Sequence, residues 1–166
     1  MGEPKLVMAI WKDGHAVWSK NKIHGGAPYF TGKADAGELM TMLDGLAKDG
    51  FFDDEELGHA RFGPDARLTT ILVKSGKHQL KMQSWHELYE FNGRFVATDA
   101  GLQALNGRSR LDALAGASAA YLHYRMAWAE LKSLVLGLAP DESQPLNGGG
   151  LEMKAGAVSW RQPGGR

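Results

Sequence analysis

The chain has no cysteine among its 166 residues. This absence excludes thiol nucleophiles, iron–sulfur clusters with cysteine ligands and zinc sites built from thiolates. It leaves the cellular compartment open, because disulfide use is not universal outside the cytosol. A chain of this length buries roughly 70% of the surface that it exposes when unfolded. We therefore expect a globular fold that needs neither a disulfide nor a metal to hold its core together.

The chain also lacks a net charge, because 19 basic residues balance 19 acidic ones. No field of one sign steers the whole molecule to nucleic acid or to an anionic membrane. No apolar run approaches the roughly 20 residues of a membrane span, and the polar N-terminal residues 1–5 lack the apolar core of a signal peptide. We predict no nucleic-acid partner and no integral membrane segment. As written the chain is typical of a cytoplasmic protein, and an exported or envelope protein remains open if a signal peptide has been removed.

The first local pattern is a β-hairpin. Two β-prone runs at residues 6–11 and 15–20 flank Asp13-Gly14, a dipeptide that favours a two-residue type I′ turn. Counting outward from such a turn places Trp11 and Trp18 diagonally together on one face of the sheet. A third strand is predicted over residues 28–33.

A helix is predicted next, because Asp35 and Glu38 have the spacing of a capping box. Gly50 supplies a left-handed stop, and the apolar residues between recur at helical spacing: Leu39, Met42, Leu43 and Leu46. The residues at 68–74 and 77–83 then form a second predicted hairpin around Ser75-Gly76. Its alternation places one set of side chains toward the core, namely Ile71, Val73, Leu80 and Met82 with His78, and puts Thr70, Lys74, Lys77, Gln79 and Lys81 on the wet face.

The C-terminal half is predicted to be mainly helical. A helical turn is expected at 86–91, and a short helix over 98–105 capped by Thr98 or Asp99. A long helical region opens at Ser109 and runs to Pro140, with a break near residues 116–118. Its apolar stripe recurs at spacings of three and four: Leu114, Ala117, Tyr121, Tyr124, Trp128, Leu131, Val135 and Leu138. His123 and Arg125, which lie off this stripe, are predicted to sit on a solvated flank.

Together these patterns predict an α+β fold. An antiparallel β-sheet is formed from the two hairpins, with a short helix between them and the long C-terminal helix packed on one face. Residues 1–139 form a single domain, 140–150 resemble a linker, 151–160 are an extra edge strand of the same domain, and 161–166 are a disordered tail.

Two constellations carry the functional hypotheses. Trp11 and Trp18, if they form a flat aromatic pair on an uncovered face, can stack on a sugar ring or on a partner's side chains. His86 and Glu90 share one helical face and, with His59 and the acidic residues 53–56, are the weak catalytic candidates of a small hydrolase or metal-dependent enzyme. They do not form a zincin motif, because the second histidine is missing, and a solvated pair at spacing i, i+4 is the commoner explanation. We predict no metal and no cofactor.

The segment from Leu6 to Trp85 resembles small uncharacterised bacterial domains built from hairpin, helix and hairpin. Three motifs carry the resemblance: the Trp-x-Asp-Gly-x-x-Val hairpin from Trp11 to Val17, the capped helix that leads to Phe51-Phe52, and the Leu-Thr-Thr-Ile-Leu-Val strand before Ser75-Gly76. Such domains are often found in exported or envelope proteins, which is what the resemblance implies for localisation. It implies no catalytic residue.

We therefore predict a non-enzymatic binding or assembly module that uses the tryptophan-bearing sheet face or an interface on the long helix. A protein partner, a homo-oligomer, a small ligand and a carbohydrate all remain open as its binding partner. The alternative hypothesis is the small hydrolase or metal-dependent enzyme.

Overall fold

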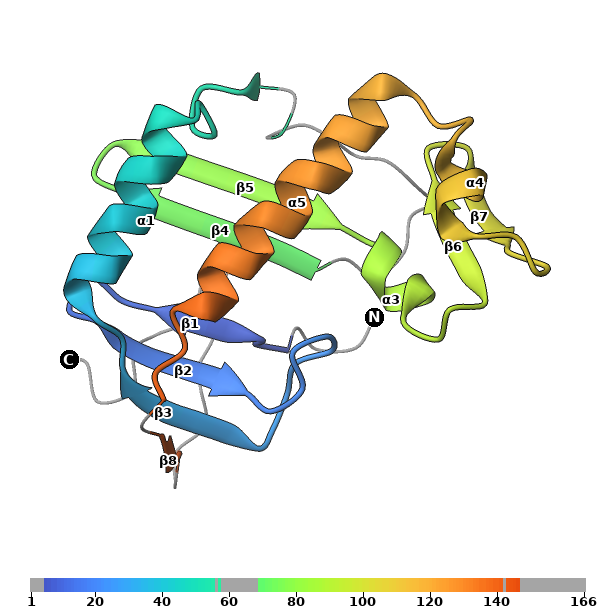
Figure 1. Cartoon of the computed structure of the whole chain (residues 1–166). Coiled ribbons are helices and arrows are strands. Elements are labelled where there is room, and N and C mark those ends of the chain that lie inside the picture. The colour runs from blue at the N-terminus through green and yellow to red at the C-terminus, as the bar shows by residue number, and fades with distance from the viewer. Residues whose placement is uncertain (1–4, 56, 58–68, 142, 147–166) are drawn as a thin grey trace. The chain divides into compact units, whose positions relative to one another are not determined.

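The computed structural model describes residues 5–55, 57, 69–141 and 143–146 (Figure 1). The strands are β1 Met8–Ile10, β2 His15–Ser19, β3 Tyr29–Lys33, β4 Thr69–Ser75, β5 His78–Ser84, β6 Phe95–Thr98, β7 Gly101–Ala104 and β8 Gln144–Pro145. The helices are α1 Ala36–Lys48, α3 His86–Glu90, α4 Arg110–Leu114 and α5 Ala119–Gly137. Every strand pair is antiparallel, which confirms the predicted α+β class.

The described strands form three hydrogen-bonded sheets rather than one. The largest has the order β1-β2-β3-β8, and the pairs β4-β5 and β6-β7 are separate hairpins. By its internal contacts the chain divides into unit 1, Met1–Asp49 with Ser133–Arg166, and unit 2, Gly50–Lys132. The four-stranded sheet and α1 belong to unit 1, and both separate hairpins belong to unit 2. A single domain over residues 1–139 stays a prediction.

The turn between β1 and β2 is one residue longer than predicted. The Trp11 N–H donates to the His15 carbonyl (2.9 Å), and the Gly14 N–H donates to the Trp11 carbonyl (2.8 Å). Three residues therefore form the loop, and Gly14 adopts the left-handed φ of +83° that closes it. The observed register pairs Met8 with Trp18, whereas the predicted two-residue turn pairs Ala9 with Trp18, so the two registers differ by one residue.

This one-residue slip reverses the faces of β1 relative to β2. Trp18 lies beside Phe30, with the ring centroids 6.4 Å apart. Trp11 lies on the opposite face beside His15, with the ring centroids 5.5 Å apart. The predicted aromatic pair of Trp11 and Trp18 on one face is therefore wrong.

The predicted capped helix is confirmed as α1. The Asp35 carboxylate accepts a hydrogen bond from the Glu38 N–H at 2.9 Å, and Gly50 follows the helix with a φ of +80°. The cap satisfies one of the backbone donors that the first turn leaves without an intrahelical partner. Leu46 is the buried residue of this helix.

The β4–β5 hairpin also differs from the predicted register, but by two residues. Ser75 pairs with His78, so Gly76 and Lys77 form the turn. A slip of two residues preserves the alternation of side chains, so the predicted apolar face is confirmed. His78, predicted to lie with the core residues, is at the turn end of that face and is exposed. Val73, Leu80 and Met82 are buried, whereas the side chains that alternate with them include the exposed Lys74 and Gln79.

The segment predicted as a short helix over 98–105 is instead the β6–β7 hairpin. Gly101 has a φ of +118°, which disfavours helix and suits the turn. Asp99 accepts a hydrogen bond from the Ser118 N–H at 2.9 Å, directly before α5, and Ser118 Oγ accepts from the Tyr121 N–H in the first turn of that helix. The predicted cap of a helix over 98–105 by Thr98 or Asp99 is therefore wrong.

The predicted break in the long helical region is confirmed, because α4 ends at Leu114 and α5 begins at Ala119. Four buried residues of α5 lie on the predicted stripe, namely Tyr121, Tyr124, Trp128 and Leu131, and Ala127 is buried beside it. None of the helices in the described part of the chain has the length and apolarity needed to cross a membrane. Within the predicted linker, Gln144 and Pro145 form β8 and pair with β3. The predicted edge strand 151–160 and tail 161–166 lie outside the described residues.

Candidate functional site

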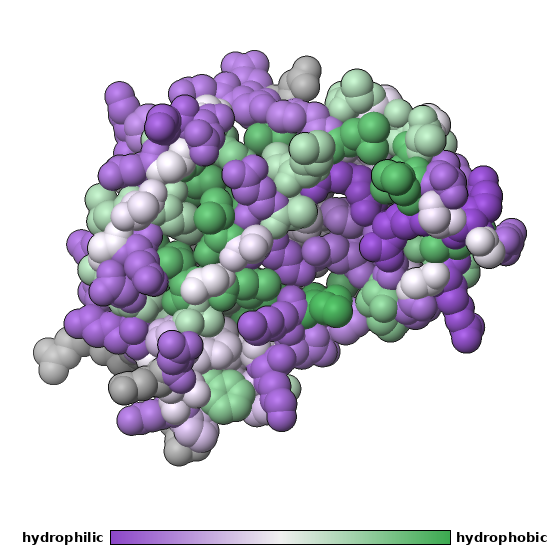
Figure 2. Space-filling model, in the orientation of Figure 1, coloured by the Kyte–Doolittle hydropathy of each residue, from purple (hydrophilic) through white to green (hydrophobic). Residues whose placement is uncertain are grey.

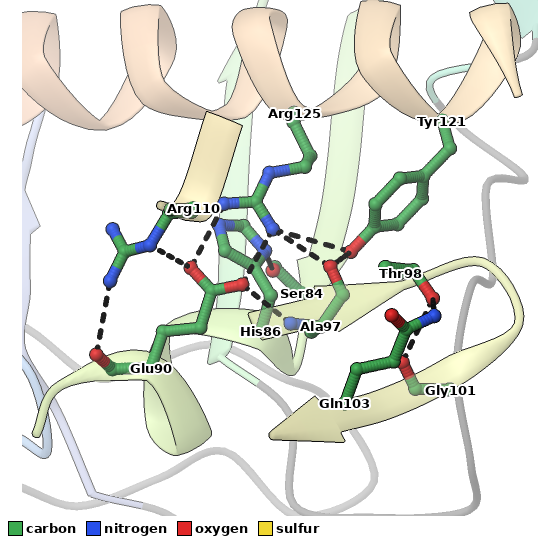
Figure 3. Close-up of polar contacts among 10 residues, drawn as sticks. All are labelled: Ser84, His86, Glu90, Ala97, Thr98, Gly101, Gln103, Arg110, Tyr121 and Arg125. Carbon is green, nitrogen blue, oxygen red and sulfur yellow. Dashed lines mark hydrogen bonds and ion pairs between the residues drawn. The ribbon is translucent and has the colours of Figure 1, made fainter. Parts of the chain in front are cut away.

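The two catalytic candidates that the structure describes, His86 and Glu90, lie in unit 2 and are buried. The exposed fraction is 6% for His86 and 5% for Glu90, which are the first and last residues of α3. Figure 3 shows that polar groups from β6, α4 and α5 converge on Glu90. The third candidate, His59, and part of the acidic segment 53–56 lie outside the described residues.

The Glu90 carboxylate is held by an arginine clamp. Arg125 Nη1 donates to Oε1 at 2.7 Å and Arg125 Nη2 donates to Oε2 at 2.9 Å. The Ala97 N–H donates to Oε1 at 2.7 Å, and Arg110 Nε lies 3.6 Å from Oε2. Both carboxylate oxygens therefore face donors, a geometry that favours the ionised form.

The charge state of this clamp follows from two opposing effects. Burial by itself raises the pKa of Glu90, but the hydrogen bonds from Arg125 and Ala97 outweigh it and hold the pKa below its ordinary value. Burial likewise lowers the pKa of Arg125, and the bonds to Glu90 and Tyr121 more than restore it. The pair is therefore charged on both sides near neutral pH.

The predicted solvated flank is wrong for Arg125, whose side chain is 14% exposed. Besides Glu90, it donates to the Ala97 carbonyl at 3.1 Å, to which Tyr121 Oη also donates at 2.8 Å. His123 is 58% exposed and lies 3.2 Å from Asp54, which agrees with the flank position predicted for it. Arg125 is four residues after Tyr121, so both side chains lie on one face of α5. This spacing is the sequence signal that Arg125 lies beside the buried Tyr121 rather than on a solvated flank.

His86 is held as a neutral ring. Its Nδ1 is hydrogen-bonded to Ser84 Oγ, and its ring lies edge-on to Trp128 with the centroids 6.3 Å apart. Burial, helped by the charges of Arg125 and Lys132, lowers the pKa of His86 to about 4, although the carboxylates of Glu90 and Glu87 oppose the shift. Ser84 is only 2% exposed, so a substrate cannot reach its hydroxyl without rearrangement of the core.

We call this group the buried polar cluster; its members are Ser84, His86, Glu90, Ala97, Tyr121 and Arg125. Serine, histidine and glutamate are the residue types of a hydrolytic triad, but here the serine is enclosed and the glutamate is bound by arginine. Among the described residues, no three His, Cys, Asp or Glu side chains form a group that could hold a metal ion. The arrangement joins α3 and β6 to the first part of α5.

An open depression lies elsewhere, in unit 1. It has a volume of about 920 Å³ and is lined by Asp13, His15, Thr31, Gly32, Lys33, Asp141, Ser143 and Gln144. Three of the lining side chains, those of His15, Thr31 and Lys33, alternate onto the same face of the sheet as Trp11. Figure 2 shows mostly hydrophilic or weakly polar side chains over β3 and β8. The predicted linker over 140–150 gives no sign that Asp141, Ser143 and Gln144 line a depression.

The floor of the depression is ordered by a short chain of hydrogen bonds. Thr31 Oγ1 donates to the Ala16 carbonyl at 3.1 Å, so its oxygen accepts from His15 Nε2 at 2.9 Å. This chain places a ring N–H at Nε2, which faces the Thr31 hydroxyl. The imidazole is thereby fixed in orientation beside Trp11.

The long helix offers the other predicted interface. Figure 2 shows hydrophobic side chains over α4 and the first turns of α5, where Leu111 is 80% exposed and Met126 is 73% exposed. Trp128 is fully buried and forms part of the core. An interface on this helix stays a prediction.

Neither protein-family models nor curated proteins nor solved structures match this chain. The resemblance of the segment from Leu6 to Trp85 to bacterial hairpin-helix-hairpin domains therefore stays a prediction, as does the localisation that it implies.

Proposed function

We propose that this protein is a non-enzymatic binding module whose ligand site is the depression of unit 1. The observation that carries the proposal is the depression itself: polar side chains from the β1–β2 loop, from β2 and β3, and from Asp141, Ser143 and Gln144 surround about 920 Å³ of open space. That volume lies within the roughly 300–1,000 Å³ typical of small-molecule sites. His15 is hydrogen-bonded to Thr31 and lies beside the half-buried Trp11 on the same face of the sheet, so one side of the site has a defined geometry.

The buried polar cluster argues against the enzyme hypothesis. A general acid or base must reach a reacting atom at hydrogen-bond distance, whereas both oxygens of Glu90 are occupied by donors from the protein. A nucleophile must be open to its substrate, and Ser84 is enclosed. These side chains therefore support the fold and leave binding as the better explanation.

Saturation-transfer NMR with a library of small polar molecules tests the proposal. The library holds monosaccharides and trisaccharides, amino acids, dipeptides, nucleotides and one ten-residue single-stranded DNA. We expect at least one compound to bind, and to bind less in Lys33→Gln, which alters the depression, but not in Lys48→Gln on α1, which removes the same charge outside it. If no compound binds, or if both variants bind equally to the wild type, the proposal is wrong.

The competing hypothesis has its own assay. Hydrolysis of p-nitrophenyl acetate, p-nitrophenyl phosphate and a p-nitrophenyl glucoside is measured for the wild type and for His86→Gln. A binding module gives no turnover above buffer for either protein. Turnover that is lost in His86→Gln, with the variant still folded, would support the hydrolase instead.

A second candidate function, self-assembly, rests on the exposed Leu111 and Met126. Contiguous exposed apolar surface is typical of contact sites, and Figure 2 shows hydrophobic side chains over α4 and the first turns of α5. Sedimentation equilibrium tests it: an oligomer that Leu111→Asn dissociates, and that Met40→Gln on the exposed face of α1 leaves intact, would support assembly. A monomer at all concentrations would dismiss it.

A further inference from the structure

We propose that Asn106 is a site of intramolecular deamidation, where the chain converts this asparagine to aspartate or isoaspartate with water as the co-reactant. The proposal is independent of the binding function proposed for unit 1. It follows from two copies of the sequence Asn-Gly-Arg, at residues 92–94 and 106–108, whose hydrogen bonding differs. A third Asn-Gly pair, at residues 147–148, lies outside the described residues.

An Asn-Gly pair supplies every group that the reaction needs except water. The Gly107 backbone nitrogen loses its proton to solvent and bonds to Cγ of Asn106. The bond from Cγ to Nδ2 breaks, and the side-chain nitrogen takes up a proton and leaves as ammonia. Water then opens the resulting succinimide ring at one of its two carbonyls, which gives aspartate or isoaspartate. Glycine permits the close approach because it has no Cβ.

Both copies of the sequence lie at the open end of the β6–β7 hairpin. Asn92 comes before β6 and Asn106 comes after β7, and the Leu105 N–H donates to the Arg94 carbonyl at 2.9 Å. Both asparagines and the glycines that follow them are exposed. In the described part of the chain, nothing lies within 4 Å of a Cβ built on either glycine. Solvent therefore reaches both pairs, and exposure does not distinguish them.

At Asn92 both reacting groups are held by hydrogen bonds. The Gly93 N–H, which would supply the nucleophile, donates to the Glu90 carbonyl at 3.0 Å. The Asn92 side-chain oxygen, which belongs to the carbonyl under attack, accepts from the Arg94 N–H at 3.0 Å. Both hydrogen bonds must open before the ring can close at this site, so the fold protects Asn92.

At Asn106 the turn leaves the same two groups unbound. Asn106 and Gly107 have φ values of +48° and +83°, and the Arg108 N–H closes the turn by donating to the Leu105 carbonyl at 2.9 Å. This is the pattern of a type I′ turn, which Asn-Gly favours. Among the described residues, neither the Gly107 N–H nor the Asn106 side chain has a hydrogen-bond partner. The fold therefore gives Asn106 no comparable protection.

The modification changes both charge and backbone at the entry to α4. Each product carries a new carboxylate, and isoaspartate also inserts one extra backbone atom into the turn, so the closing hydrogen bond from Arg108 loses its geometry. The turn leads to Ser109, which caps α4, and to Arg110, whose Nε lies 3.6 Å from Glu90 Oε2. Deamidation therefore alters the segment that carries Arg110 to the buried polar cluster.

The experiment compares the two sites within one chain. The protein is incubated at mildly alkaline pH, once folded and once unfolded in urea, and the peptides that carry residues 92 and 106 are analysed by mass spectrometry after proteolysis. In urea we expect similar rates, because both asparagines precede Gly and Arg. In the folded protein we expect Asn106 to convert at least about tenfold faster than Asn92, because two hydrogen bonds must first open at Asn92.

Asn106→Gln is the matched variant, because its longer side chain closes the corresponding ring far more slowly. It should abolish the conversion at residue 106 and leave the rate at Asn92 unchanged. If the ratio of the two rates is the same in the folded protein as in urea, the inference is wrong. Conversion in urea with none at Asn106 in the folded protein also overturns it. Faster amide exchange of Arg108 in the modified protein would support the effect on the turn, and unchanged exchange would dismiss that effect.

Discussion

Gly14 shows how one residue fixes the geometry of the candidate site. Its φ of +83° belongs to the left-handed region, and a Cβ built on it would lie 2.6 Å from the Ala34 carbonyl oxygen. The Ala34 N–H donates to the Gly14 carbonyl at 2.7 Å, so the loop is also tied to the end of β3. A side chain at this position would displace the loop that carries Asp13 and His15.

Gly14→Ala should therefore destabilise the protein more than a left-handed φ alone explains. Gly50→Ala is the control, because Gly50 has a similar φ of +80° but nothing within 4 Å of its added Cβ. We expect a loss of about 1–2 kcal/mol for Gly50→Ala from the backbone conformation, and a loss at least 1 kcal/mol larger for Gly14→Ala, in roughly the range of overpacking. Urea unfolding measures both values. Equal losses would show that the contact with Ala34 is absent in solution.

His86 gives a pH dependence whose sign can be derived. Its pKa is about 4 in the folded protein and about 6.5 in an unfolded chain, so the unfolded state binds a proton first as the pH falls. Stability that is fully present above pH 6.5 is then lost toward pH 4, by about 3 kcal/mol in total. The lowered pKa of Glu90 also reduces the stability of the folded protein as the pH falls, but only at pH values below the ordinary pKa of a glutamate.

Urea unfolding at several pH values tests this window. The wild type should lose stability between pH 6.5 and pH 4, and His86→Gln should remove most of that slope. His78→Gln, at an exposed position on β5, is the control and should retain it. Parallel profiles for the wild type and His86→Gln would contradict a buried neutral His86.

At the scale of elements, the two hairpins explain what the sequence could and could not predict. Alternation of apolar and polar residues located β2, β3, β4 and β5, and a two-residue error in the β4–β5 turn left the buried face correct. A one-residue error in the β1–β2 turn reversed the positions of Trp11 and Trp18. Asp13-Gly14 fits both a two-residue turn and a three-residue loop, and the hydrogen bond from Gly14 to Trp11 decides between them.

The observed register makes a prediction for NMR. The hydrogen bonds at either end of the β1–β2 pair leave Met8 with Trp18, and Ile10 with Ala16, as non-hydrogen-bonded pairs. Their Hα atoms should therefore give strong mutual nuclear Overhauser effects, since Cα atoms in such pairs are only about 4.5 Å apart. Strong effects between Ala9 and Trp18 instead would restore the two-residue turn and reunite the tryptophans on one face.

The buried polar cluster was beyond prediction for a different reason. Glu90 and Arg125 are 35 residues apart, and no local pattern states that α3 and α5 meet. His86 and Glu90 were recognised as sharing one face of a short helix, and the structure brings them together as expected. Whether that face is solvated or buried depends on what covers it, which periodicity alone does not give.

At the scale of the whole molecule, the two features of interest lie in different units. The buried polar cluster lies within unit 2, and the depression lies within unit 1. Glu90→Gln removes one partner of a buried ion pair, a change that typically destabilises by about 3–5 kcal/mol. If the units are separate cooperative bodies, amide hydrogen exchange in this variant should accelerate in β5 and β6 but not in β2 and β3.

Glu87→Gln is the matched control, because Glu87 is also on α3 and pairs with Lys132, but its side chain is 26% exposed. Its effect on exchange should be small. Equal acceleration of β2, β3, β5 and β6 in Glu90→Gln would instead support the single cooperative domain predicted from the sequence.

The central claim is that ligand binding belongs to unit 1 and that the buried polar cluster is structural. A chemical-shift map with the strongest ligand of the polar library tests it most directly. The account predicts saturable shifts for the amides of His15, Lys33, Ser143 and Gln144, and none for those of Ser84, His86 and Glu90. Shifts centred on His86 and Glu90, with the depression unchanged, would contradict it.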